Sequence, residues 1–146
     1  MGVIHRETQD CDILSPEIPS EIKKLSEEFA KEKKMNREDL SLDWLNNGPK
    51  TLGTDLPTGW TERVEVIFSR NALTLRTLGR EDLLKSKLFA YCDRATDFGD
   101  CIALRPTQDE LSYALPWLKK RDATPYWPSH VESELKRLAE KLGHGL

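Results

Sequence analysis

Polar and apolar residues alternate in three stretches of the chain, and a period of two is the pattern of a β-strand. The first stretch runs from Arg6 to Leu14 and predicts a strand near the N-terminus. The other two, residues 64–68 and 73–77, are separated by a short Ser-Arg-Asn segment. Two strands joined by such a short connection predict a β-hairpin.

Two helices are expected between the first strand and the hairpin. Apolar residues at helical spacing predict an amphipathic helix over about residues 19–34. This apolar stripe consists of Ile18, Ile22, Leu25 and Phe29. Asn36 can cap a second, short helix that carries Trp44 and Leu45 on its apolar side. Glycines and prolines within residues 48–61 predict an irregular connection to the hairpin.

From Arg80 onward the spacing of apolar residues predicts helices. The first buries a stripe of Leu84, Leu88 and Tyr91, and another is expected from about Thr96 to Leu104, before Pro106. The last two helices should open at the capping boxes Thr107-x-x-Glu110 and Ser129-x-x-Glu132. Gly143 suits the C-terminal cap of the last one.

This order of elements predicts an α+β fold, in which a small sheet packs with helices and the C-terminal half is helical. The length of 146 residues fits one domain. We therefore expect a single domain over residues 1–146, with a sheet-containing part over about 1–78 and a helical part over about 79–146.

Composition excludes several classes of protein. With 22 Lys and Arg against 25 Asp and Glu, the net charge is −3, so RNA binding is not indicated by charge. No apolar run approaches the roughly 20 residues of a membrane span, and no secretory signal is visible, so we expect a cytoplasmic protein without membrane contact. Cys11, Cys92 and Cys101 lack C-x-x-C spacing and are expected to be reduced thiols, packed as small apolar residues.

The strongest chemical signal is the pair of acids in Asp10-Cys11-Asp12. In a strand, alternate residues share one face, so the two carboxylates should lie about 6–7 Å apart. Such a pair can hold Mg²⁺, which bridges substrate phosphates in phosphoryl and nucleotidyl transfer. By itself the pattern is also common on solvated surface strands.

Three stretches together resemble motifs of the nucleotidyltransferase superfamily. They are Gly2-x-x-x-Arg6-x-Thr8-x-Asp10-x-Asp12-Ile13-Leu14, Asp43-Trp44-Leu45-Asn46, and Leu83-Leu84-x-x-Lys87-Leu88-x-Ala90 through Arg94-x-x-Asp97-x-x-Asp100. The resemblance is to uncharacterised bacterial members related to abortive-infection toxins and minimal nucleotidyltransferases, and it spans most of residues 2–142.

The resemblance implies a catalytic metal site on Asp10 and Asp12 that holds a nucleoside triphosphate. A third carboxylate normally completes such a site, and Glu65 is the candidate, with Glu62 as the alternative. The expected reaction transfers a nucleoside monophosphate to a protein or RNA hydroxyl.

The same resemblance implies nucleotide-binding roles for further residues. Lys87 would neutralise phosphate charge, and the remaining members of this set are Arg6, Thr8, Arg94, Asp97 and Asp100. For the four residues after position 80, a salt-bridged helix face explains the pattern equally well.

One departure from the superfamily pattern concerns the start of the chain. The Gly-Gly or Gly-Ser loop that receives the triphosphate would precede Gly2, which suggests a degenerate or truncated enzyme. Loss of that segment would expose a strand edge at Asp10–Leu14, so we expect a homodimer or a protein partner there. The alternative function is a non-catalytic protein-interaction module, part of a toxin–antitoxin or phage-defence system.

Two weaker constellations are more typical of core packing than of chemistry. Cys92 with His130 or His144 could form a nucleophile and base, but a buried thiol is commoner. Trp117, Tyr126 and Trp127 could stack on a base or ligand, but helix packing is the more usual role of such residues.

Overall fold

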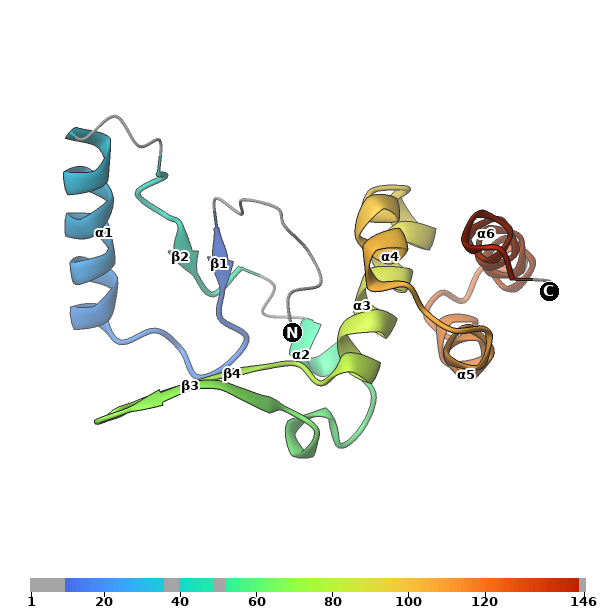
Figure 1. Ribbon diagram of the computed structural model, residues 1–146, viewed down its shortest axis with the longest axis horizontal. Coiled ribbons are helices and arrows are strands. Elements are labelled where there is room, and N and C mark those ends of the chain that lie inside the picture. Colours follow the sequence, from blue (N-terminus) through green and yellow to red (C-terminus); the bar gives the residue numbers. More distant parts are fainter. Residues whose placement is uncertain (1–9, 36–39, 49–51, 145–146) are drawn as a thin grey trace. The chain divides into compact units, whose positions relative to one another are not determined.

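The computed structural model describes residues 10–35, 40–48 and 52–144 (Figure 1). Its elements are β1 (Cys11–Asp12), α1 (Ser20–Met35), β2 (Leu45–Asn46), α2 (Leu52–Asp55), η1 (Trp60–Glu62), β3 (Glu65–Arg70), β4 (Leu73–Thr77), α3 (Arg80–Arg94), α4 (Phe98–Leu104), α5 (Gln108–Leu118) and α6 (Trp127–Leu142). Two small sheets and a helical C-terminal half confirm the predicted α+β class.

These described residues divide into two compact units, one ending at Asp55 and the other beginning at Leu56. The single domain expected over residues 1–146 stays a prediction. Among the described residues, none of the helices combines the length and the apolar character that crossing a bilayer requires.

In the first unit, β1 pairs in parallel with β2, and Asp12 lies opposite Asn46. The backbone N–H of Ile13 donates to the Asn46 carbonyl at 2.8 Å. Parallel strands need a long crossover, and α1 lies within it, close to the predicted 19–34. The described strand is much shorter than the predicted Arg6–Leu14, of which residues 6–9 lie outside the described part.

The prediction of a short helix carrying Trp44 and Leu45 is wrong, because Leu45 belongs to β2. The Asn36 end of that helix lies outside the described residues. Trp44 contacts α1 instead: its indole Nε1 donates to the Ser26 carbonyl at 3.0 Å, and its ring lies 5.9 Å from that of Phe29. Tertiary packing and strand pairing thus override the local capping pattern.

On α1, the residues that the first unit buries are small. Ser26 and Ala30 are buried, whereas Ile22 and Leu25 of the apolar stripe are 47% and 59% exposed. The helix is therefore present as predicted, but its apolar stripe is largely open to solvent in the described structure.

One side chain holds the segment that follows β1. Asn47 donates through Nδ2 to the carbonyl oxygens of Ile13 at 2.8 Å and Pro16 at 3.1 Å, and its Oδ1 accepts from the Ile18 N–H at 2.9 Å. Three hydrogen bonds of one side-chain amide hold the segment that leaves β1 next to β2. The position of Asp12 therefore depends on Asn47.

The predicted hairpin is confirmed: β3 and β4 pair antiparallel. The turn is shorter than expected because β3 extends to Arg70, and Asn71 adopts the left-handed backbone of a tight hairpin, with φ of 52°. Phe68 pairs with Leu75, and Arg70 pairs with Leu73. All residues of β3 are exposed.

The connection before the hairpin is less irregular than predicted, since it contains α2 and η1. Directly after η1, Arg63 makes a two-point ion pair with Asp82 of α3, with bonds of 2.8 and 2.7 Å. The Asp82 side chain is completely buried. This pair attaches the connection to the first turn of α3.

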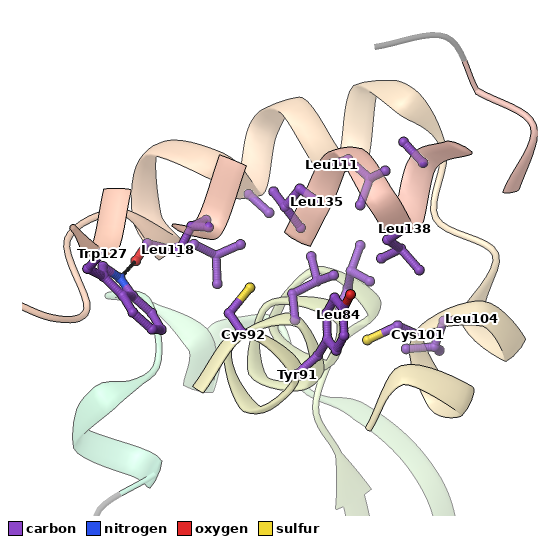
Figure 2. Packing of buried hydrophobic residues seen from close by; sticks show 14 residues of the cluster. Leu84, Tyr91, Cys92, Cys101, Leu104, Leu111, Leu118, Trp127, Leu135 and Leu138 are labelled. Atoms are coloured by element: carbon purple, nitrogen blue, oxygen red, sulfur yellow. Dashed lines mark hydrogen bonds between the residues drawn. The ribbon is translucent and has the colours of Figure 1, made fainter. Parts of the chain in front are cut away.

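Helices α3 to α6 enclose the apolar core of the second unit (Figure 2). Leu84, Leu88 and Tyr91 form the predicted buried stripe of α3. Trp127 at the start of α6 is also buried, and its indole Nε1 donates to the Leu118 carbonyl at 2.8 Å. Its role is therefore helix packing.

The two predicted capping boxes differ in outcome. The Thr107 box is present, with Glu110 N–H donating to Thr107 Oγ1 and Thr107 N–H to Glu110 Oε2. The Ser129 box is wrong, because α6 begins at Trp127 and the Ser129 hydroxyl donates to the Tyr126 carbonyl. With Trp127 buried, this helix starts three residues earlier than a Ser129 N-cap would place it. Gly143 caps its end with φ of 81°, as predicted.

Helix α4 and the three cysteines agree only in part with the predictions from the sequence. Helix α4 begins at Phe98 rather than at about Thr96 and ends at Leu104 as predicted. All three cysteines are free thiols. Cys92 and Cys101 are buried as predicted, whereas the prediction of a packed Cys11 is wrong, since this residue is exposed.

The buried thiols predict a loss of stability in alkali. Burial, followed by nearby carboxylates, raises the pKa of Cys92 and of Cys101 to about 12. Unfolded thiols lose their protons from about pH 8.5, so between about pH 9 and 12 the unfolded state binds fewer protons and the free energy of unfolding falls as pH rises. Urea unfolding followed by circular dichroism should give a lower midpoint at pH 10.5 than at pH 8. A Cys92→Ala/Cys101→Ala variant should show a smaller drop, and an equal drop in both proteins would contradict a role of the thiols.

Candidate functional site

The predicted site residues are divided between the two units. Asp10 and Asp12 belong to the first unit. The second unit contains the predicted third carboxylate and the predicted phosphate-binding residues, namely Glu62, Glu65, Lys87, Arg94, Asp97 and Asp100. Arg6 and Thr8 lie outside the described residues, and their predicted roles remain predictions.

Strand β1 presents two carboxylates to solvent. Asp10 directly precedes the strand, Asp12 is its last residue, and both are exposed. Asp12 is the register partner of Asn46 in β2, so parallel pairing brings these two side chains next to each other.

An amide oxygen and a carboxylate oxygen converge over Gly48. The position that a Cβ on residue 48 would take lies 2.5 Å from Asn46 Oδ1 and 2.7 Å from Asp12 Oδ1. The orientation of the amide has a physical cause, because Asn46 Nδ2 donates to the Asp43 carbonyl at 3.2 Å. The absence of a side chain at Gly48 leaves space between the two oxygens and solvent.

This set of donors suits a hard divalent cation, which prefers carboxylate and amide oxygens. Among the described residues, no group of three or more His, Cys, Asp and Glu side chains gathers that could hold a metal ion. The first unit therefore offers two aspartates and one amide, and Mg²⁺ commonly completes such a small protein ligand set with water and substrate phosphates. The sequence pattern assigned no role to Asn46, although this residue belongs to the middle motif.

The charges of the two aspartates affect the pKa of the Cys11 thiol that lies between them in the sequence. Partial burial, followed by the negative charges of Asp12 and Asp10, raises the pKa of Cys11 above its ordinary value. The thiolate is the reactive form, so Cys11 should react slowly with alkylating reagents although it is exposed. A cation bound to Asp10 and Asp12 would offset their negative charge and so lower the pKa of Cys11.

In the second unit, three of the predicted residues come together. Lys87 of α3 donates to Asp97 Oδ1 and to Asp100 Oδ2, each at 2.8 Å. Burial acts to lower the pKa of Lys87, but the hydrogen bonds that its ammonium donates to Asp100 and Asp97 outweigh this effect and raise the pKa overall. The ammonium therefore stays charged. Arg94 is 65% exposed and lies near Asp93 instead, at 3.9 Å.

The two candidates for a third carboxylate are both exposed. Glu65 opens β3 opposite Thr77, and Glu62 ends η1. Since both belong to the second unit, the choice between them stays a prediction.

A family model described as a nucleotidyltransferase of unknown function (DUF6036) matches residues 1–107. The chain belongs to this family. The matched part contains every predicted site residue from Arg6 to Asp100 and ends just before α5, so DUF6036 covers less of the chain than the resemblance over residues 2–142. Neither a curated protein nor a solved structure matches the chain.

The alternative nucleophile outside these motifs has no support from the geometry. His130 Nε2 donates to the Cys92 carbonyl oxygen at 2.8 Å, and burial keeps the Cys92 thiol protonated by raising its pKa. His144 Nε2 is likewise engaged with the Pro106 carbonyl, at 2.9 Å.

Alkylation of Cys11 should report a cation at Asp10 and Asp12. Adding Mg²⁺ at pH 8 should speed the reaction of Cys11 with iodoacetamide, because the cation offsets the carboxylate charge and lowers the thiol pKa. Peptide mass spectrometry measures the rate at this residue. An Asp10→Asn/Asp12→Asn variant should react faster without Mg²⁺ and should not respond to it. A wild-type rate that Mg²⁺ leaves unchanged would count against a cation site here.

Proposed function

We propose that this protein is a metal-dependent nucleotidyltransferase that transfers a nucleoside monophosphate from a nucleoside triphosphate to a protein or RNA hydroxyl. The observation that carries the proposal is the pair of exposed aspartates at β1, Asp10 just before the strand and Asp12 at its end, with Asn46 beside Asp12, inside the region matched by a nucleotidyltransferase family. Exposed oxygen ligands on a strand are accessible to both a cation and a triphosphate.

Asp10 and Asp12 are the residues that would hold Mg²⁺. When bound, the ion neutralises phosphate charge and stabilises the attacking and leaving oxygens of the transfer. The contribution of the chain is to fix the carboxylates: β1 pairs with β2, and Asn47 holds the segment that follows Asp12.

Lys87 is the proposed phosphate contact in the second unit. Its ammonium has three N–H donors, of which Asp97 and Asp100 accept two, and the raised pKa keeps it charged. In this role Asp97 and Asp100 orient the ammonium. Arg6, Thr8 and Arg94 remain proposed contacts to the nucleotide, and Glu65, or alternatively Glu62, the proposed third carboxylate.

The proposed reaction exchanges one phosphorus–oxygen bond for another. The acceptor hydroxyl oxygen attacks the α-phosphorus, the bond from that phosphorus to the bridging oxygen breaks, and pyrophosphate leaves with the bonding electrons. The hydroxyl proton passes to a carboxylate or to water. Within the superfamily, the three sequence motifs favour the bacterial proteins related to abortive-infection toxins, and hence a toxin–antitoxin or phage-defence role.

A second candidate function is a non-catalytic protein-interaction module. The hairpin favours it, because Phe68, Leu73 and Leu75 are each at least 40% exposed on one face. Contiguous exposed apolar side chains commonly mark a contact with another chain. Such a module would form a homodimer or bind another protein.

The proposal predicts that Mn²⁺, used as a probe for Mg²⁺, binds the wild-type protein and that Asp10→Ala/Asp12→Ala weakens binding about tenfold or more, because both charged ligands are lost. Electron paramagnetic resonance of free Mn²⁺ gives the affinity. A nucleoside triphosphate labelled at the α-phosphate should label protein or RNA with the wild type and not with the variant. The matched control is Glu21→Ala/Glu28→Ala, which removes two exposed carboxylates from α1 of the same unit.

Two results would contradict the proposal. Mn²⁺ affinity that is equal in wild type and Asp10→Ala/Asp12→Ala would remove these residues from the metal site. Metal binding without transfer of label would favour the interaction module, for which light scattering over a dilution series should then show a mass above that of one chain.

A further inference from the structure

The side chains of Asp12 and Asn46 bring two hydrogen-bond acceptors together without a donor between them. Both Oδ1 atoms lie within 2.7 Å of the position that a Gly48 Cβ would take. Among the described residues, no N–H or O–H group donates to either atom. Two acceptor oxygens that face one point can share a cation or a hydrogen-bond donor placed between them.

The adjacent asparagine shows a different use of the same side chain. Asn47 engages both its Nδ2 and its Oδ1 with backbone groups of residues 13–18. Within the described part of the chain, Asn46 engages only Nδ2, with the Asp43 carbonyl, and its oxygen faces the same point over Gly48 as the Asp12 carboxylate. Asn47 therefore stabilises the fold, whereas the oxygen of Asn46 is available to a ligand.

We infer that Asn46 Oδ1 is a direct ligand of the divalent cation held by Asp10 and Asp12, and supplies the third protein oxygen of that site. The inference rests on the proposed function and deepens it. Parallel pairing makes Asn46 the register partner of Asp12, so the third ligand comes from the neighbouring strand of the same unit.

A neutral third ligand suits a cation that must also bind a triphosphate. Two aspartates nearly balance the charge of Mg²⁺, and a third carboxylate at this position would add repulsion against the phosphate oxygens. An amide oxygen adds a ligand without that repulsion, so the proposed third carboxylate is not needed at this position. Gly48 keeps the approach open, because any side chain there would meet both ligand oxygens.

The test exchanges the proposed oxygen ligand for sulfur. Asn46→Cys is made in a Cys11→Ser background, because Cys11 is exposed and could itself bind a soft metal, whereas Cys92 and Cys101 are buried. Relative to Cys11→Ser alone, the double variant should bind Mn²⁺ about tenfold more weakly and Cd²⁺ more tightly, with new thiolate-to-cadmium absorption in the ultraviolet. A residue that only positions Asp12 would not produce this absorption.

Gly48→Ala provides a second measurement that keeps both ligands. Gly48 does not adopt a left-handed backbone, so alanine is compatible with the chain here, while its Cβ would force the two oxygens apart. Mn²⁺ affinity should fall about tenfold with an unchanged circular dichroism spectrum.

The outcomes separate this inference from the proposed function. If Mn²⁺ binding depends on Asp10 and Asp12 but is unchanged by Asn46→Cys and by Gly48→Ala, Asn46 is not a ligand and the proposed function stands. If the Cys11→Ser protein does not bind Mn²⁺ at all, both the inference and the proposed metal site are overturned.

Discussion

The parallel pairing of β1 with β2 determines the geometry of the candidate site in the first unit. Each strand contributes two residues, yet their register places Asp12 beside Asn46 and leaves Asp10 and Asp12 at either end of Cys11. So short a ladder has little stability of its own. The side chain of Asn47 supplies the missing constraint through three bonds to the segment that leaves β1. Asn47 therefore holds the strand pair in place, and the adjacent Asn46 contributes to the proposed cation site.

Elements that depend on local interactions were predictable from the sequence. The Thr107 capping box, the stripe on α3 and the hairpin turn are decided by residues close to one another in the chain. The errors arose where distant contacts decide. Leu45 joins a strand because β1 pairs with it, and α6 starts early because Trp127 is buried against Leu118.

Part of the candidate site could be predicted from the sequence. Motif spacing selected Lys87 together with Asp97 and Asp100, which do contact one another. The pairing of Asp10 with Asp12, inferred from alternation within one strand, stays a prediction. The role of Asn46 could not be found this way, because more than thirty residues separate it from Asp12 and only the parallel register brings the two together. The one local signal in the sequence was Gly48, two positions after Asn46. Its significance becomes clear only from the positions of Asn46 Oδ1 and Asp12 Oδ1 in the structure.

A cation site formed by Asp10, Asp12 and Asn46 is tested most directly by anomalous X-ray diffraction from crystals of the full chain grown with Mn²⁺. We predict an anomalous peak at coordination distance, about 2.0–2.4 Å, from carboxylate oxygens of both aspartates and from Asn46 Oδ1. A crystal in which Asn46 turns its NH₂ group to donate to Asp12, with no manganese between β1 and β2, would contradict it.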